Sequence, residues 1–455
     1  MNGKGMRMTD MTTGSPLRRI LIFALPILIG NIFQHVYGVV DTMVAGYVLG
    51  DDAIAAIGAT SSLYGVILSI AWGMNSGLAL VVTRRFGAHD VPNMRRAVAG
   101  TIMLDVSTAL IMTALSLSLL RPLMRLLHTP DAIFKDAYSY MVLICVGIGA
   151  SIAFNLFASL LRAVGNSTVP LIFLIVSSVT NIALDVLFIV GLHWGVAGAA
   201  FATVLAQLLS AVLSGVYFVK RYRELLPQKG EFRIPKKLFG ELLSSGLAMT
   251  FMYSVVEIGT VFYQSATNAL AETLGEGIIT AHTAARRLLD IFMTPLLTIS
   301  DAGAVFIGQN YGAKKPKRVR SGVSSELALA LIWGVLSVVI VWLFGASIVR
   351  FTTGTSNATV LDNAVLSLRI HSPFLPVLGV LLSLRTAMQA VGVKTPTVVS
   401  SGIELGMKIL ASLCLIPVLG FVGTCITEPI IWVLCAVYLT VMWLMKRCIV
   451  YREAV

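Results

Sequence analysis

The stretch 168–190, TVPLIFLIVSSVTNIALDVLFIV, is a predominantly apolar run of the length that a membrane-spanning helix needs. A hydrocarbon layer of about 30 Å is crossed by roughly 20 helical residues. The run contains a single ionisable side chain, Asp185. Similar stretches recur along nearly the whole chain, so we predict an all-α polytopic membrane protein.

The composition of the chain agrees with this prediction. Of its 455 residues, 57% are hydrophobic and 12% are charged, and the mean hydropathy is +0.87. Soluble domains carry roughly 25% charged residues, so a water-soluble protein is excluded. The sequence lacks a phosphate-binding loop, an HExxH or GxSxG motif and a Cys/His cluster. We therefore expect no enzyme activity, no cofactor and no metal other than a coupling Na⁺.

The apolar runs and the loops between them predict twelve transmembrane helices. An even number of spans puts both termini on one side of the membrane, where Lys and Arg also gather. By the positive-inside rule this side is the cytoplasm, in a multi-pass protein of the inner (cytoplasmic) membrane. The net charge of +12 is thus explained by the basic loops that set the membrane topology, and no nucleic-acid partner is expected. The helices lie near 17–47, 54–83, 98–119, 132–161, 168–190, 195–219, 239–267, 278–309, 322–343, 361–391, 396–416 and 421–445.

An internal repeat relates the two halves of the chain. GDDAIAA at 50–56 matches GEGIITA at 275–281, and FGA at 86–88 matches YGA at 311–313, both at an offset of 225 residues. Two further matches follow in the same order along the chain. The sequence therefore indicates a duplication of a six-helix unit.

Six spans in each half make both halves enter the membrane in the same direction, so a pseudo-two-fold axis along the membrane normal should relate them. We predict an N-lobe at 1–219, a cytoplasmic linker at 220–238, and a C-lobe at 239–455. Substrate would then bind between the two lobes.

Two acids lie inside predicted spans of the first half. An ionisable group at mid-span costs about 2.5 to 3.5 kcal/mol, so it needs a partner, water or a function. Asp41 lies in the first helix and Asp185 in the fifth, where Asn181 shares its helix face. The set of side chains that could complete a polar pocket is Gln34, Asn155 and Thr203.

Two carboxylates in one low-dielectric pocket are not readily both ionised, unless a bound cation neutralises them. This is the chemistry of a proton or Na⁺ site, and the residue types suit either ion. The alternative is that Asp41 and Asp185 only hydrogen-bond helices together. Pro26, in the same helix as Asp41, removes a backbone hydrogen bond and is a candidate hinge or a fixed kink.

The second half carries its own charged residues within predicted spans. Glu404 and Lys408 have the spacing and order of a helical ion pair. They either satisfy each other or take part in coupling or substrate binding, and the sequence leaves both alternatives open. Glu257 has no such partner in its helix.

With Pro26 and Asp41 in the first helix, Asn181 and Asp185 in the fifth, and GVAGAAFAT at 195–203, the chain resembles the multidrug and toxic compound extrusion (MATE) family. The resemblance spans essentially the whole sequence. It implies two lobes that exchange H⁺ or Na⁺ for cationic or amphiphilic compounds by alternating access.

The resemblance also implies particular roles for residues of this chain. It places an ion site in the N-lobe at Asp41, Asn181, Asp185 and Thr203, together with the Ala199 carbonyl. It associates protonation of the first-helix acid with bending at a position like Pro26. In the C-lobe, the residue that could take a coupling role is Glu257.

The expected partners are small-molecule substrates and membrane lipid, and the expected oligomeric state is a monomer. The alternative function is a lipid-linked oligosaccharide flippase, or another solute exporter of the wider superfamily. A flippase would favour a strongly cationic cleft for pyrophosphate, whereas the first half offers acids. The sequence therefore favours multidrug efflux by antiport of a cation.

Overall fold

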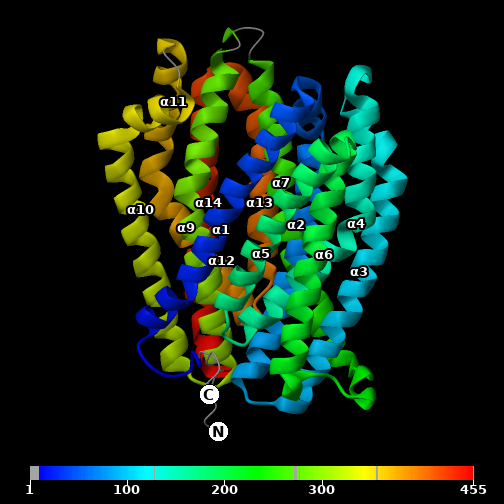
Figure 1. Cartoon of the computed structure of the whole chain (residues 1–455). Coiled ribbons are helices and arrows are strands. Elements are labelled where there is room, and N and C mark those ends of the chain that lie inside the picture. Colours follow the sequence, from blue (N-terminus) through cyan, green and yellow to red (C-terminus); the bar gives the residue numbers. More distant parts are fainter. Residues whose placement is uncertain (1–9, 128, 271–273, 276, 355–356, 454–455) are drawn as a thin grey trace. The chain divides into compact units, whose positions relative to one another are not determined.

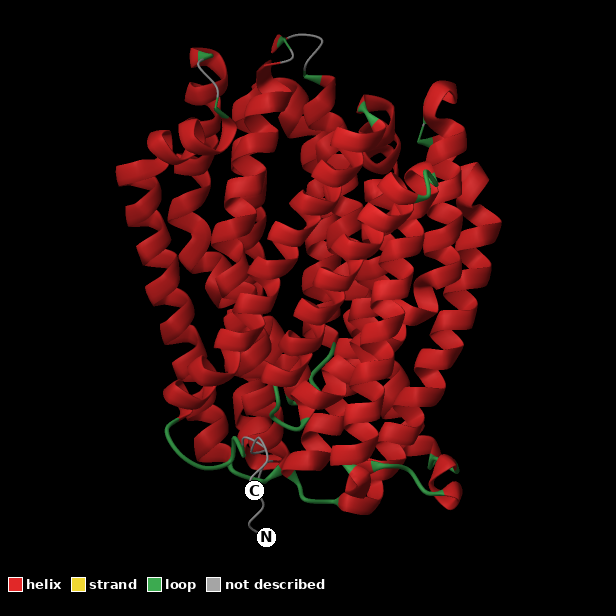
Figure 2. Cartoon of the chain, in the orientation of Figure 1, coloured by secondary structure: helices red, strands yellow, loops and turns green. Residues whose placement is uncertain are grey.

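The structure is a computed structural model of the chain, and it describes residues 10–127, 129–270, 274–275, 277–354 and 357–453. Every regular element within these ranges is a helix, and none is a strand (Figure 2). The predicted all-α fold class is confirmed.

The chain divides into two compact units. The first is built on Leu25–Thr250, and the second on Met11–Ala24 and Phe251–Val455. The predicted lobe boundaries at 1–219, 220–238 and 239–455 stay a prediction. Two long helices, α1 (Pro16–Leu49) and α7 (Lys236–Ala269), each begin in one unit and end in the other.

The helices of the first unit follow one another with short connections (Figure 1). A π-helix, η1, directly continues α5. Besides parts of α1 and α7, the unit contains α2 (Asp51–Gly87), α3 (Val91–Leu126), α4 (Asp131–Ala163), α5 (Thr168–Asp185), η1 (Val186–Gly191), α6 (Gly195–Arg221), η2 (Arg223–Leu225) and η3 (Lys229–Phe232).

The second unit repeats this pattern, and a π-helix, η5, again follows its fifth spanning helix. Its elements after α7 are α9 (Gly277–Gly312), α10 (Pro316–Thr353), α11 (Ala358–His371), η4 (Ser372–Phe374), α12 (Leu375–Ala390), α13 (Thr395–Leu410), η5 (Ala411–Leu415) and α14 (Ile416–Glu453). The two π-helices begin at Val186 and Ala411, which are again 225 residues apart. Because π-helical turns are rare and occur often at functional sites, their equivalent positions support a duplicated functional unit.

Eleven segments within the described residues are long and apolar enough to cross a membrane. The last of them, Thr395–Arg447, has 53 residues, and a helix of that length would measure about 80 Å, far more than one bilayer. Gly420 interrupts it with φ 58° and ψ −138°. Since a glycine adopts positive φ without steric cost, the chain turns there and crosses twice, which gives the twelve predicted spans.

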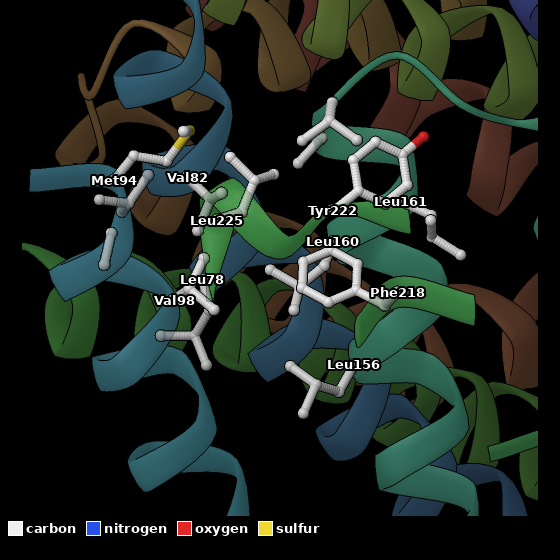
Figure 3. Close-up of a cluster of buried hydrophobic side chains, with 14 of the residues drawn as sticks. Leu78, Val82, Met94, Val98, Leu156, Leu160, Leu161, Phe218, Tyr222 and Leu225 are labelled. Atoms are coloured by element: carbon white, nitrogen blue, oxygen red, sulfur yellow. The ribbon is translucent and has the colours of Figure 1, made fainter. Parts of the chain in front are cut away.

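A cluster of buried apolar side chains lies in the first unit where α2, α3, α4 and α6 meet. Leu78 of α2, Val98 of α3, Leu160 of α4 and Phe218 of α6 are all buried in one cluster (Figure 3). Nearby, Gly77 of α2 lies so close to the backbone of α7 that a Cβ atom there would overlap a carbonyl oxygen. This packing places the first part of α7 in the first unit.

Ion pairs fasten the same end of α7. Glu241 pairs with Arg84 at 3.0 Å and with Arg85 at 2.6 Å, both from the last turn of α2. The preceding segment is attached by Arg95, which donates to the carbonyl oxygen of Glu224 at 2.7 Å.

The start of α1 is held in the second unit in a corresponding way. Asn310 donates to the carbonyl oxygen of Met11 at 3.0 Å, and Arg318 donates to the carbonyl oxygens of Met11 and Gly14 at 2.9 and 2.8 Å. Polar contacts therefore attach the start of α1 to the second unit and the start of α7 to the first unit.

Candidate functional site

The polar residues predicted in the fifth helix of the first half lie together in the interior of the first unit. Asn181 and Asp185 are one turn apart on α5, and their exposed fractions are 1% and 0%. Asn181 Nδ2 donates to Thr203 Oγ1 on α6 at 3.3 Å. The structure thus brings the carboxyl, amide and hydroxyl groups of these three residues into one buried region.

Helix α6 supplies the other side of this region. Ala199 is buried and lies one turn before Thr203, so the two share a helix face. Asp185 is the last residue of α5, immediately before the π-helix η1. The wider turn that begins there alters the direction in which the backbone carbonyls point. Carboxylate, amide, hydroxyl and carbonyl oxygens are ligands that suit a small cation, and the carboxylate alone can bind a proton.

The other candidates of the first unit are Asp41, Gln34 and Asn155. Asp41 belongs to α1, but its side chain lies outside those that the structure describes. Gln34 is exposed. Asn155 is half-buried and donates to the carbonyl oxygen of Ser151 in its own helix at 2.9 Å, so its amide is bonded within α4.

Pro26 lies inside α1, two residues after the helix passes from the second unit to the first at Ala24. A proline at that place removes one helical hydrogen bond where the helix changes partners. The position suits a hinge, and this role stays a prediction.

The second unit contains a buried charged network around Glu428 of α14. The exposed fraction of its side chain is 5%, and it pairs with Arg286 of α9 at 2.7 Å. Arg286 also pairs with Asp290 one turn later at 3.2 Å. His371, at the end of α11, places Nε2 at 3.8 Å from the second carboxylate oxygen of Glu428.

A second buried group centres on Glu404 of α13. Its predicted pairing with Lys408 is present at 3.5 Å, and Arg385 of α12 adds a closer pair at 3.0 Å. Lys408 also donates to Thr260 of α7 at 3.3 Å. Glu257 is exposed on α7.

The charges of these two groups balance. Three cationic side chains, those of Arg286, Arg385 and Lys408, face three carboxylates within the second unit. Such a network is compensated internally and has no excess positive charge for a pyrophosphate. A coupling or substrate role for its members stays a prediction.

Two buried acids were missed by the sequence reasoning. Asp105 of α3 and Glu326 of α10 have exposed fractions of 2% and 0%. The sequence did mark both residues, because each is a lone carboxyl in an apolar run, as Asp41 and Asp185 are. Neither has an ionisable or amide residue one turn away to mark a site, and only the structure shows how deeply both are buried.

Comparison with known proteins supports the duplicated arrangement. The family model MatE matches residues 26–187 and again residues 253–414. Among curated relatives, the probable multidrug resistance protein YpnP of Bacillus subtilis is 27% identical over 391 residues, which cover 85% of each chain. An FAD transporter of Shewanella oneidensis is 24% identical over 71% of each chain.

The fold also matches solved structures. A crystal structure of MATE in the bent conformation superposes with a TM-score of 0.90, over 99% of this chain and 100% of that one, at 20% identity. At this level of identity the likeness concerns the fold, and it covers both units.

Proposed function

The chain belongs to the MatE family of membrane transporters and is not an enzyme, and we propose that it exports cationic or amphiphilic organic compounds in exchange for H⁺ or Na⁺ by alternating access. The curated relatives include multidrug resistance and multidrug export proteins. Efflux of small molecules is therefore the activity that the comparisons favour.

The observation that carries the coupling part of the proposal is the buried cluster of Asn181, Asp185 and Thr203. A fully buried carboxyl beside an amide and a hydroxyl is costly in a membrane unless it serves a purpose. Asp41 and the Ala199 carbonyl complete the proposed site, in keeping with the family resemblance. Binding of one ion there would change the charge of the α5–α6 contact, and bending of α1 at Pro26 would link that change to transport.

The alternative is export of another solute, such as a lipid-linked oligosaccharide or a nucleotide-like compound, as the name of the Shewanella relative suggests. A phosphate-bearing substrate needs uncompensated positive charge. The buried ion-pair network of the second unit offers no such charge, and the acids of the first unit favour a cationic substrate instead. Glu257, Glu404 and Lys408 are the candidate contributors to coupling or substrate binding in that unit.

We propose further that the protein acts as a monomer surrounded by lipid in the inner membrane, with both termini in the cytoplasm. The clusters of Lys and Arg at the same ends of the helices support this orientation.

The deciding experiment is efflux of ethidium from everted vesicles under separately imposed pH and Na⁺ gradients. We expect Asp185→Asn and Asp41→Asn to abolish gradient-driven efflux, because an amide cannot bind a proton or supply negative charge. Asp362→Asn changes an exposed acid on α11 and should leave efflux unchanged. Undiminished coupled efflux in both site variants would refute the proposed ion site.

A further inference from the structure

Glu326 is a buried acid that the proposed site does not use. It lies ten residues after the start of α10, about 15 Å along the helix, and its exposed fraction is 0%. Its Oε1 atom accepts a hydrogen bond from Thr386 Oγ1 of α12 at 3.3 Å, and the same hydroxyl proton is shared with the carbonyl oxygens of Leu382 and Ser383 at 3.0 and 3.2 Å. Ser383, also buried, lies three residues earlier on the same face of α12. The carboxyl therefore faces two hydroxyl groups, those of Thr386 and Ser383, and no amide or guanidinium group donates to it within the described residues.

The second oxygen of the carboxyl lies against the backbone of α9. Oε2 of Glu326 has no hydrogen-bond partner among the described residues. It lies against Gly303 of α9, where a Cβ atom would overlap the carboxyl group. A hard metal cation needs a shell of about six oxygen ligands. The close approach of α9 leaves no room for such a shell on this side, whereas a proton needs none.

The charges on the helices around Glu326 do not neutralise it. On α9, Asp301 has the same sign. On α12, Arg385 is adjacent to Thr386 but pairs with Glu404. On α10 itself, Arg318 lies two turns earlier and binds the start of the chain. No salt bridge within the described part of the chain reaches Glu326, so an ionised carboxyl would be buried without compensation.

The first unit contains a related feature. The position equivalent to Glu326 by the repeat is Thr101, and Asp105 lies one turn beyond it on α3. Both oxygens of Asp105 are buried, and neither has a hydrogen-bond partner among the described residues. The third helix of each half thus carries an uncompensated buried carboxyl on the same face.

We propose that Glu326 is a proton-binding site of the second unit, which holds a proton while α9 packs against α10 and releases it when that contact loosens. Oε1 accepts from Thr386 and Oε2 carries the proton, so the buried group is neutral. Proton binding stands on this geometry alone. Only the timing of release rests on the proposed transport function.

Infrared difference spectroscopy of the full chain in lipid tests proton binding directly. Wild type minus Glu326→Gln should show the C=O stretch of a protonated carboxylic acid at neutral pH. Glutamine keeps the volume and the acceptor for Thr386, so the variant should fold. Glu224→Gln removes an exposed glutamate outside the spans and should show no such band. Absence of the band in the Glu326 difference would overturn the proposal.

Thr386→Val provides a second variant that is independent of Glu326 itself. It removes the hydroxyl that donates to Oε1, so the band should remain but shift in frequency. An unshifted band would show that Thr386 does not bond the protonated carboxyl and would overturn the assigned geometry.

Release is tested by adding ethidium to the same sample while a soluble pH dye reports protons. We expect the band to weaken and protons to appear in wild type, and both changes to be reduced in Glu326→Gln. A band that never responds would refute release. The band should persist in Asp185→Asn even where coupled efflux is lost, so failure of the proposed function and failure of this inference are distinguishable.

Discussion

The buried pair of Arg286 and Glu428 allows a quantitative test of the second unit. We consider Arg286→Met, which keeps the apolar stem of the side chain but removes the charge. Glu428 would then remain 5% exposed and would have lost its closest cation, at 2.7 Å, while the His371 ring stays at 3.8 Å and Lys408 acts from farther away. Breaking a buried ion pair by removing one partner costs about 3 to 5 kcal/mol.

We expect the lower end of that range, about 3 kcal/mol, because the side chain of Arg286 is 26% exposed and the pair is therefore not fully buried. The assay is reversible unfolding in mixed micelles of a mild detergent and SDS. Arg287→Met, next to it on α9 and exposed, is the matched control and should change stability by less than about 0.5 kcal/mol.

A double-mutant cycle identifies the cause. Glu428→Gln should also destabilise the protein, and Arg286→Met combined with Glu428→Gln should cost less than the two single effects together, by about 0.5 to 3 kcal/mol. That saving arises because no uncompensated charge stays buried in the double variant. Strictly additive effects, or a loss for Arg287→Met equal to that for Arg286→Met, would refute the reasoning.

Two further predictions concern the first unit. Gly77→Ala should destabilise it by about 1 to 3 kcal/mol in a thermal-unfolding assay, because the added Cβ atom overlaps the carbonyl oxygen of Ser245. Gly58→Ala on the same helix is the control, because its Cβ atom would meet no atom within 4 Å. Glu241→Gln should cost about 1 kcal/mol for each of its two arginine pairs, since its side chain is 27% exposed, and the loss should shrink at high salt. A loss that salt does not change would contradict its attribution to charge attraction between Glu241 and the two arginines.

The features that sequence reasoning predicted well depend on local chain properties. The length of an apolar run such as 168–190 is set by the thickness of the bilayer, so the spans could be predicted without knowledge of their neighbours. The pairing of Glu404 with Lys408 follows from the helical repeat of 3.6 residues, which places them on one face.

Contacts between helices could not be derived in this way. Arg385 reaches Glu404 from another helix, and Arg286 reaches Glu428 across 142 residues of chain. Such partners depend on how helices pack and rotate. For the same reason Glu326 was overlooked, since nothing adjacent in sequence shows that its carboxyl lies against Gly303 without a cation.

The sequence by itself thus determined the membrane class, the twelve spans, the repeat at 225 residues and the resemblance that identifies the family. Bilayer thickness and helical periodicity act on each segment separately, so these features can be recognised within single segments of the sequence. Only the tertiary structure decided that α1 and α7 begin in one unit and end in the other, and that Asn181 bonds Thr203. It also decided that Glu404 and Glu428 are paired with buried cations whereas Glu326 is not. Burial and charge compensation are properties of several helices packed together, and no single segment contains them.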